Sequence, residues 1–238
     1  MRRAMRPPVP SRVRLAAHRL VWLLAMLWLG TQTALAACCG PITPAGDQLR
    51  QFLDQSGVEH LWLPHEHVHW LTGLPDLERP GQSRHATHCS AYVAAMSVRL
   101  GVPLLRPPEH RADMLATPQT QWLETTGPSQ GWREVDRRVA QSLANQGEFV
   151  LAAWANPDPR RSGHIAIVRP SMQTTAELDQ HGPELTMAGH LNALRISTER
   201  GFEDHPGAWI AGGKGTVRFF AHTVDWSRVQ AQPSPTRP

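Results

Sequence analysis

Apolar residues recur at three- and four-residue spacing in three stretches of this 238-residue chain, and this spacing predicts three helices. The first covers residues 47–55 and the second covers residues 90–100. The third begins near Val135 and ends at Gly147, because glycine readily adopts the backbone conformation that closes a helix.

Two continuous apolar runs, Phe149–Trp154 and His164–Val168, predict strands that pair antiparallel across a proline-containing turn. Residues 185–188 and 217–221 predict two more strands. Since the helices precede the strands, we expect an α+β fold in which an antiparallel sheet packs against the helix over residues 90–100.

The N-terminal segment has the pattern of a secretory signal peptide. Six arginines precede an unbroken apolar run, Leu20–Leu29, and small residues follow it. This run is shorter than the roughly 20 residues that a helix needs to cross a bilayer. We therefore expect residues 1–37 to be removed on export.

Two cleavage patterns overlap at the end of this segment. Residues 34–36 fit the pattern of the general signal peptidase. Residues 35–38 resemble a bacterial lipobox, and we favour this interpretation, which predicts lipidation of Cys38 and an outer-membrane tether. The alternative is a free protein that begins near Ala37. Both interpretations predict a bacterial envelope protein, which is periplasmic, bound to the outer membrane or secreted.

Removal of the signal peptide changes the charge of the chain. Residues 1–37 hold six of the 24 basic residues and none of the 20 acidic ones, so the remainder has 18 against 20, a formal charge of −2. This balance argues against a nucleic-acid partner. Residues 38–229 are enough for one domain with a sizeable core. We expect residues 230–238 to be a disordered tail, because they lack large apolar side chains.

Three cysteines, Cys38, Cys39 and Cys89, matter because exported proteins normally pair their cysteines. Three cysteines cannot all pair with one another. If Cys38 carries lipid, a bond between Cys39 and Cys89 would block the more reactive thiol. We therefore predict that Cys89 is free, and we assign no role to Cys39.

Cys89 lies where a predicted helix begins, and His164 lies where a predicted strand begins. The positive end of a helix dipole and a nearby imidazolium both lower a thiol pKa, to about 3.5 to 7.5 at reactive sites. A histidine on a neighbouring strand can take the thiol proton and later give it to a leaving amine. We predict that Cys89 is a nucleophile and His164 is its base.

Both segments resemble known enzymes. Residues 88–104 resemble the nucleophile helix of NlpC-type cell-wall peptidases, and residues 163–168 resemble the histidine strand of CHAP amidohydrolases. The chain departs from the NlpC pattern at His88, where Asp is common, and at Ala91, where Gly is common. The resemblance implies a papain-like thiol hydrolase that cuts amide bonds in peptidoglycan peptides without a metal or organic cofactor.

The resemblance also implies a third polar residue, which holds the imidazole in orientation. Asn192 is the first candidate and His190 is the second. The backbone N–H of Cys89 is the default donor for the oxyanion. Further candidates for the oxyanion site or the cleft are His88, Gln82 and Tyr92.

A histidine cluster supports a non-enzymatic alternative. If the surrounding segment is extended, His65, His67 and His69 share one strand face, and together with His60 they could bind zinc or copper. The alternative function is therefore a metal-binding or structural lipoprotein of the envelope.

The same region permits a permuted enzyme, in which a histidine upstream of Cys89 is the base. His69 and His85 are the candidates. We rank both below His164, because Gly163 and His164 open a well-defined apolar strand.

Overall fold

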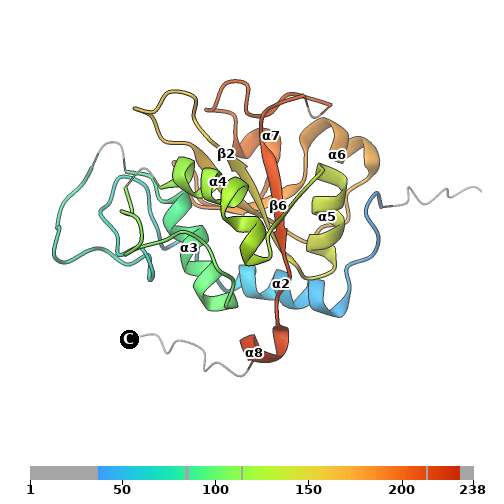
Figure 1. The fold of residues 1–238 in the computed structure, drawn as a ribbon, viewed down its shortest axis with the longest axis horizontal. Coiled ribbons are helices and arrows are strands. Elements are labelled where there is room, and N and C mark those ends of the chain that lie inside the picture. Colours follow the sequence, from blue (N-terminus) through green and yellow to red (C-terminus); the bar gives the residue numbers. More distant parts are fainter. Residues whose placement is uncertain (1–36, 84–85, 114, 213, 231–238) are drawn as a thin grey trace, which may run out of the picture. The chain divides into compact units, whose positions relative to one another are not determined.

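Six strands form one antiparallel sheet at the centre of the fold (Figure 1). The computed structural model describes residues 37–83, 86–113, 115–212 and 214–230, which belong to one compact unit. In order across the sheet, the strands are β1 (Arg133–Val135), β6 (Arg218–His222), β2 (Phe149–Trp154), β3 (His164–Val168), β4 (Glu184–Met187) and β5 (Ala193–Ser197).

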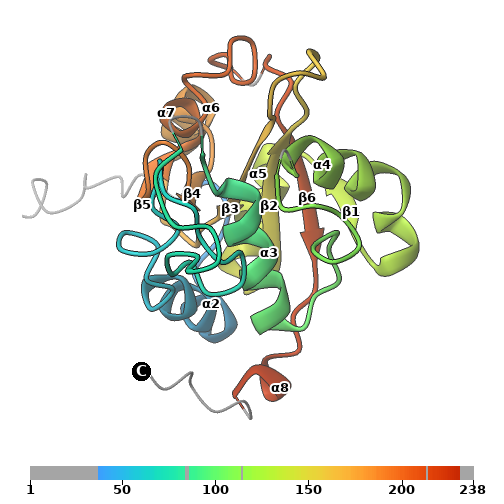
Figure 2. The same cartoon turned by 90° about the vertical axis from the view of Figure 1, so that its left-hand side faces the viewer.

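Helices cover both faces of the sheet (Figure 2). One face packs against α2, α3 and α4, and the other packs against α5 and the end of α7. The helices of the described residues are α2 (Pro44–Asp54), α3 (Cys89–Leu100), α4 (Ala116–Thr125), the 3₁₀ helix η1 (Gly127–Gln130), α5 (Arg137–Asn145), α6 (Thr175–His181), α7 (Thr198–Gly201) and α8 (Trp226–Gln230).

The two central strands, β2 and β3, are buried along their whole length. Successive side chains of a strand point to opposite faces. Ile165 and Ile167 accordingly belong to the core on the α3 side, whereas Ala166 and Val168 belong to the core on the α5 side. This division decides where the first residue of β3 directs its side chain.

The α+β class and the antiparallel sheet are confirmed. β2 and β3 have the predicted bounds, and their register pairs Trp154 with His164. The three predicted helices correspond to α2, α3 and α5. The short strands β1 and β5, and the remaining helices, were not predicted. β1 is three residues long and mostly exposed, so it has no apolar pattern to detect.

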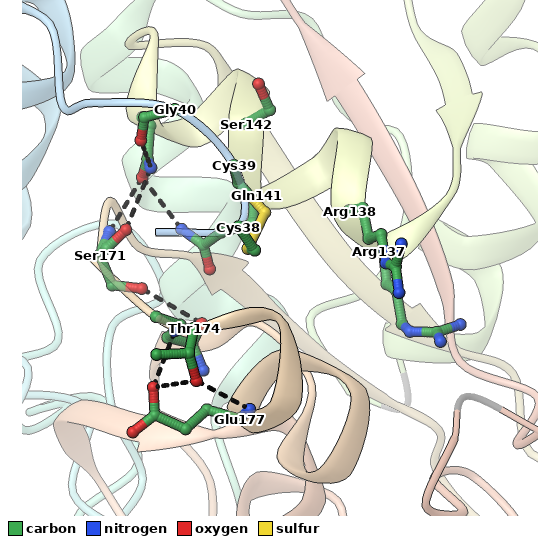
Figure 3. Close-up of a disulfide and its surroundings, with 12 residues drawn as sticks. Cys38, Cys39, Gly40, Arg137, Arg138, Gln141, Ser142, Ser171, Thr174 and Glu177 are labelled. Carbon is green, nitrogen blue, oxygen red and sulfur yellow. Dashed lines mark hydrogen bonds between the residues drawn. A yellow bond between two sulfur atoms is a disulfide. The ribbon is translucent and has the colours of Figure 1, made fainter. Parts of the chain in front are cut away.

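The chain enters the described structure at a disulfide between the adjacent cysteines Cys38 and Cys39 (Figure 3). The N–H of Cys38 donates to the carbonyl of Gln173, and Asn145 Nδ2 donates to the carbonyl of Gly40. Lipidation of Cys38 conflicts with this disulfide, because the lipid would occupy the same sulfur. Cys39 is thereby given a partner that sequence reasoning missed.

The predicted signal peptide, residues 1–37, and the predicted tail, residues 230–238, lie outside the described residues, except for Ala37 and for Gln230, which ends α8. Within the described residues, no helix is both long enough and apolar enough to cross a membrane. Cys89 is free, as predicted, and it is buried.

Candidate functional site

Cys89 is the first residue of α3, whose buried small and apolar residues pack on β3. Its side chain is buried, and the residue is 3% exposed. Burial raises the pKa of the thiol, because the charged form loses hydration, while the backbone N–H groups of Ile165, Ser90 and Cys89 act in the opposite direction. Burial is the larger effect, so the resting thiol is protonated at neutral pH.

The sulfur lies beside a cavity of about 210 Å³. The cavity is formed by the N-terminal end of α3 and by loops that precede and follow this helix. Its wall is polar and apolar in about equal parts and carries charges of both signs. The lining residues include His67, Trp70, Arg79, Ser83, His88 and Asp113. A small polar substrate group could therefore approach the thiol from the loop side.

His164 is the first residue of β3, as predicted, but its ring does not meet the thiol. The ring lies 4.8 Å from the ring of Phe202 and 5.1 Å from that of His205, measured between centroids. Phe202 belongs to the core on the α5 side, whereas Cys89 belongs to the core on the α3 side. The two predicted segments are brought together, since Ile165 meets the sulfur, but the imidazole is turned to the opposite face of the sheet.

The His164 ring is also unsupported by hydrogen bonds. Its Nε2 is buried and has no partner among the described residues. Burial, together with the smaller effects of the nearby His205 and His190, lowers the pKa of His164 to about 3. The imidazole is therefore neutral at neutral pH and could accept a proton, but only a rotation would bring it to the sulfur.

We expect acid to destabilise the protein through His164. The unfolded imidazole binds a proton below about pH 6.5, whereas the native one does so only near pH 3, so stability falls as the pH drops through this interval. At pH 4 the loss is about 3 kcal/mol. Urea unfolding of the wild type and of His164→Phe, at pH 7 and pH 4, measures it.

The comparison of these two proteins is needed because burial also lowers the pKa values of His88 and His205. Both groups remain in the variant, and phenylalanine keeps an aromatic ring against His205, which stacks on His164 in the wild type. The wild type should lose more stability than His164→Phe on acidification. Equal losses would show that His164 does not titrate in this way.

Asn192 does not hold the His164 imidazole. Its Nδ2 donates to the carbonyls of Val58, Leu61 and Trp62 at 2.8 to 3.2 Å, and its Oδ1 accepts from the N–H of Gly189 at 3.0 Å. All of these partners are backbone groups. A Cβ on Gly189 would lie 3.4 Å from Cε1 of His164, so Asn192 fixes a segment that contacts the imidazole. Its predicted direct contact with the ring is absent.

The other candidates also differ from expectation. His190 is exposed and forms a short ion pair with Asp204. Gln82 is exposed and does not line the cavity. Tyr92 is fully buried and donates to Ser56 Oγ at 3.1 Å, so it is a core residue and not part of the cleft.

His88 does line the cavity, but its hydrogen bonding excludes the predicted oxyanion role. Its Nε2 lies 2.8 Å from the carbonyl oxygen of Glu66. A carbonyl can only accept, so Nε2 carries the proton and is occupied. Burial lowers the pKa of His88, so the ring is neutral and has no second N–H to offer an oxyanion.

The histidine-rich segment does not form the predicted strand. Glu66 and Val68 make isolated bridges, and His65 has a φ of 67°, which breaks an extended run. In the described part of the chain, no group of three His, Cys, Asp or Glu side chains could hold a metal ion. The predicted shared strand face is therefore wrong.

Of the upstream histidines in the permuted alternative, the structure describes only His69, and it does not place this residue at the thiol. His69 contacts Thr72 and stacks on Trp70, and it does not line the cavity. His85 lies outside the described residues. His67 does line the cavity, which sequence reasoning missed, because nothing in the spacing of residues 60–70 indicates which histidine a loop turns inward.

The comparison with models of known protein families finds no match, and neither does the comparison with curated proteins. The chemistry open to the site follows from its own groups. A buried thiol at a helix start, with backbone N–H groups directed at its sulfur and a cavity beside it, could attack a carbonyl once a base removes its proton.

Proposed function

We propose that this protein is an exported thiol amidohydrolase that cleaves amide bonds in peptidoglycan peptides through Cys89. The observation that carries the proposal is the free thiol at the start of α3, with a cavity beside it that is lined by polar, charged and apolar side chains. We also propose that the fold is papain-like, because a cysteine helix packs on an antiparallel sheet.

The reaction proceeds by covalent catalysis. The thiol loses its proton to an imidazole, the sulfur attacks the amide carbonyl, and the C–N bond breaks as the imidazole returns the proton to the leaving amine. Water then hydrolyses the thioester and restores the thiol. The N–H of Cys89 is the proposed donor to the oxyanion.

His164 is the proposed base, and this assignment requires a rotation. Because the Cβ of His164 points to the α5 face, this rotation requires the backbone at the first residue of β3 to turn as well as the side chain. The ring then leaves Phe202 and His205 and approaches the sulfur, which already meets the N–H of Ile165. Substrate binding in the cavity would drive this movement by offering the imidazole a hydrogen-bonding partner.

The proposed substrate follows from location and resemblance. A bacterial envelope protein meets peptidoglycan, and the cysteine and histidine segments resemble those of enzymes that cut this polymer. The cavity, with Arg79 and Asp113 in its wall, suits a peptide with charged side chains. No observation favours the metal-binding alternative.

The proposal is tested by incubating the mature protein with purified muropeptides and identifying the products by mass. We expect new fragments that differ from the substrate by one water. Treatment with iodoacetamide should abolish their formation, and excess muropeptide should slow the alkylation of Cys89. The absence of any cleaved product would refute the proposal.

A further inference from the structure

We infer that Nδ1 of His88 accepts a hydrogen bond from a substrate N–H beside the bond that is cut, so that His88 determines specificity for peptides carrying this donor. The inference rests on the proposed function and deepens it. It concerns a residue that occupies the position directly before Cys89 and lines the same cavity.

The tautomer of His88 is fixed by the backbone. Because Nε2 lies 2.8 Å from the carbonyl oxygen of Glu66, Nε2 must carry the ring proton. The neutral ring then has a lone pair on Nδ1. The same hydrogen bond holds the ring in one orientation, as a carbonyl commonly does for functional histidines. Nδ1 is consequently an acceptor in a fixed position.

This acceptor is unused in the structure. No described residue forms a hydrogen bond with Nδ1 of His88. The ring is half-buried, and burial is the largest influence that lowers its pKa. The nearby His67 acts in the same direction, while Asp113, Glu66 and the hydrogen bond to the Glu66 carbonyl oppose it. The ring therefore keeps its Nδ1 lone pair at neutral pH.

The surroundings of Nδ1 favour a donor and not an acceptor in the substrate. The carboxylate of Asp113 lines the same cavity and is close enough to raise the pKa of His88, so a second acceptor lies near the ring. A peptide offers two kinds of N–H beside a scissile carbonyl, an amide in an intact chain or a free α-amine at its end. Both present the same chemistry to Nδ1.

The test is a double-mutant cycle on binding, carried out in the inactive Cys89→Ala protein. Isothermal calorimetry would measure a peptidoglycan stem tetrapeptide and analogues that are N-methylated at one position each. We expect His88→Phe to weaken binding of the unmodified peptide about tenfold, the equivalent of one hydrogen bond. For the analogue methylated at the contacted N–H, His88→Phe should change affinity less than twofold.

Equal weakening of every peptide by His88→Phe, or no detectable binding of the tetrapeptide, would overturn the inference. His88→Gln is the second variant, because its amide can donate to Glu66 and still offer an oxygen. It should restore discrimination between the peptide and its methylated analogue. Thermal unfolding shows whether each variant is folded.

Two further peptides show whether the N–H that binds Nδ1 belongs to an amide or to a free α-amine. A tetrapeptide with a free α-amine and its N-acetylated form distinguish an amine from an amide. Binding with coupling but without hydrolysis by the wild type would refute the proposed function and leave the inference standing. Hydrolysis by the wild type without coupling between His88 and the substrate N–H would refute the inference and leave the proposed function standing.

Discussion

Replacing Cys89 with alanine is expected to reduce the rate of muropeptide cleavage at least about a thousandfold, because the variant has no nucleophile. The fold should persist, since alanine fills most of the volume of a buried cysteine and begins a helix well. Mass-resolved rates of product formation measure the effect. Circular dichroism and thermal unfolding establish that the variant is folded.

The matched control is Ser97→Ala on the same helix. Ser97 is also buried, but its hydroxyl donates only to the carbonyl of Ala94 in its own helix. This variant should cleave at nearly the wild-type rate. If Cys89→Ala and Ser97→Ala retained equal activity, any hydrolysis would have to arise from another group, and the thiol mechanism would be wrong.

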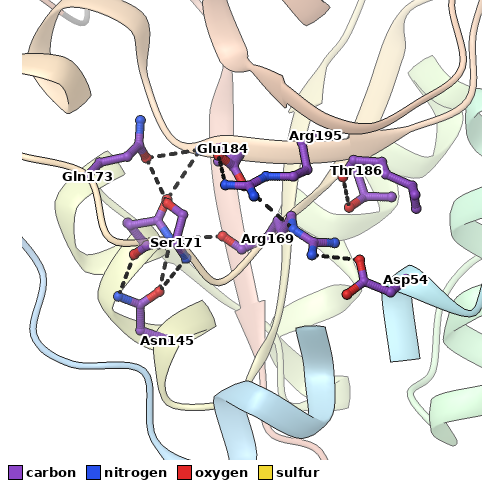
Figure 4. Close-up of polar contacts among 10 residues, drawn as sticks. Asp54, Asn145, Arg169, Ser171, Gln173, Glu184, Thr186 and Arg195 are labelled. Carbon is purple, nitrogen blue, oxygen red and sulfur yellow. Dashed lines mark hydrogen bonds and ion pairs between the residues drawn. The ribbon is translucent and has the colours of Figure 1, made fainter. Parts of the chain in front are cut away.

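Replacing Arg169 with alanine is expected to destabilise the protein by about 3 kcal/mol, because it truncates a buried side chain and removes its charged hydrogen bond to the half-exposed Asp54. The Arg169 side chain is 4% exposed and donates to Asp54 Oδ1 at 2.6 Å, with Glu184 Oε1 at 3.5 Å (Figure 4). Its removal leaves Asp54 without this partner and opens a cavity beside β3. Urea unfolding monitored by tryptophan fluorescence measures the loss.

Arg195 provides the control, because it pairs with the same carboxylate, Glu184, from an exposed position. Its Nε lies 3.0 Å from Oε1, but its side chain is 67% exposed. Exposed ion pairs contribute little, so Arg195→Ala should cost less than about 1 kcal/mol. Similar losses for Arg169→Ala and Arg195→Ala would show that burial does not determine the strength of these pairs.

The central hairpin could be predicted from the sequence because β2 and β3 are continuous apolar runs separated by a clear turn. The direction of His164 could not. Ile165 and Ile167 face α3, but Ala166 and Val168 are equally apolar, so the alternation gives no sign of which face α3 covers. A strand buried on both faces hides its orientation, and the predicted contact between imidazole and sulfur failed for this reason.

The loop residues that line the cavity were harder to predict than Cys89. Cys89 could be predicted because it lies at the start of a helix, and a helix start is a local pattern in the sequence. His67 and Asp113 lie on loops, where hydrogen bonds such as that between Asp76 N–H and the His67 carbonyl set the path of the chain. Such contacts depend on the folded backbone, so spacing along the sequence does not reveal them.

The bond between the neighbouring residues Cys38 and Cys39 has a consequence for work with this protein in an oxidising compartment. Both sulfurs are satisfied locally, and the chain has only three cysteines. Cys89 therefore has no free cysteine in the same chain with which to form a disulfide. It is also left as the one sulfhydryl that an alkylating probe can mark, so each molecule should report its site with a single tag.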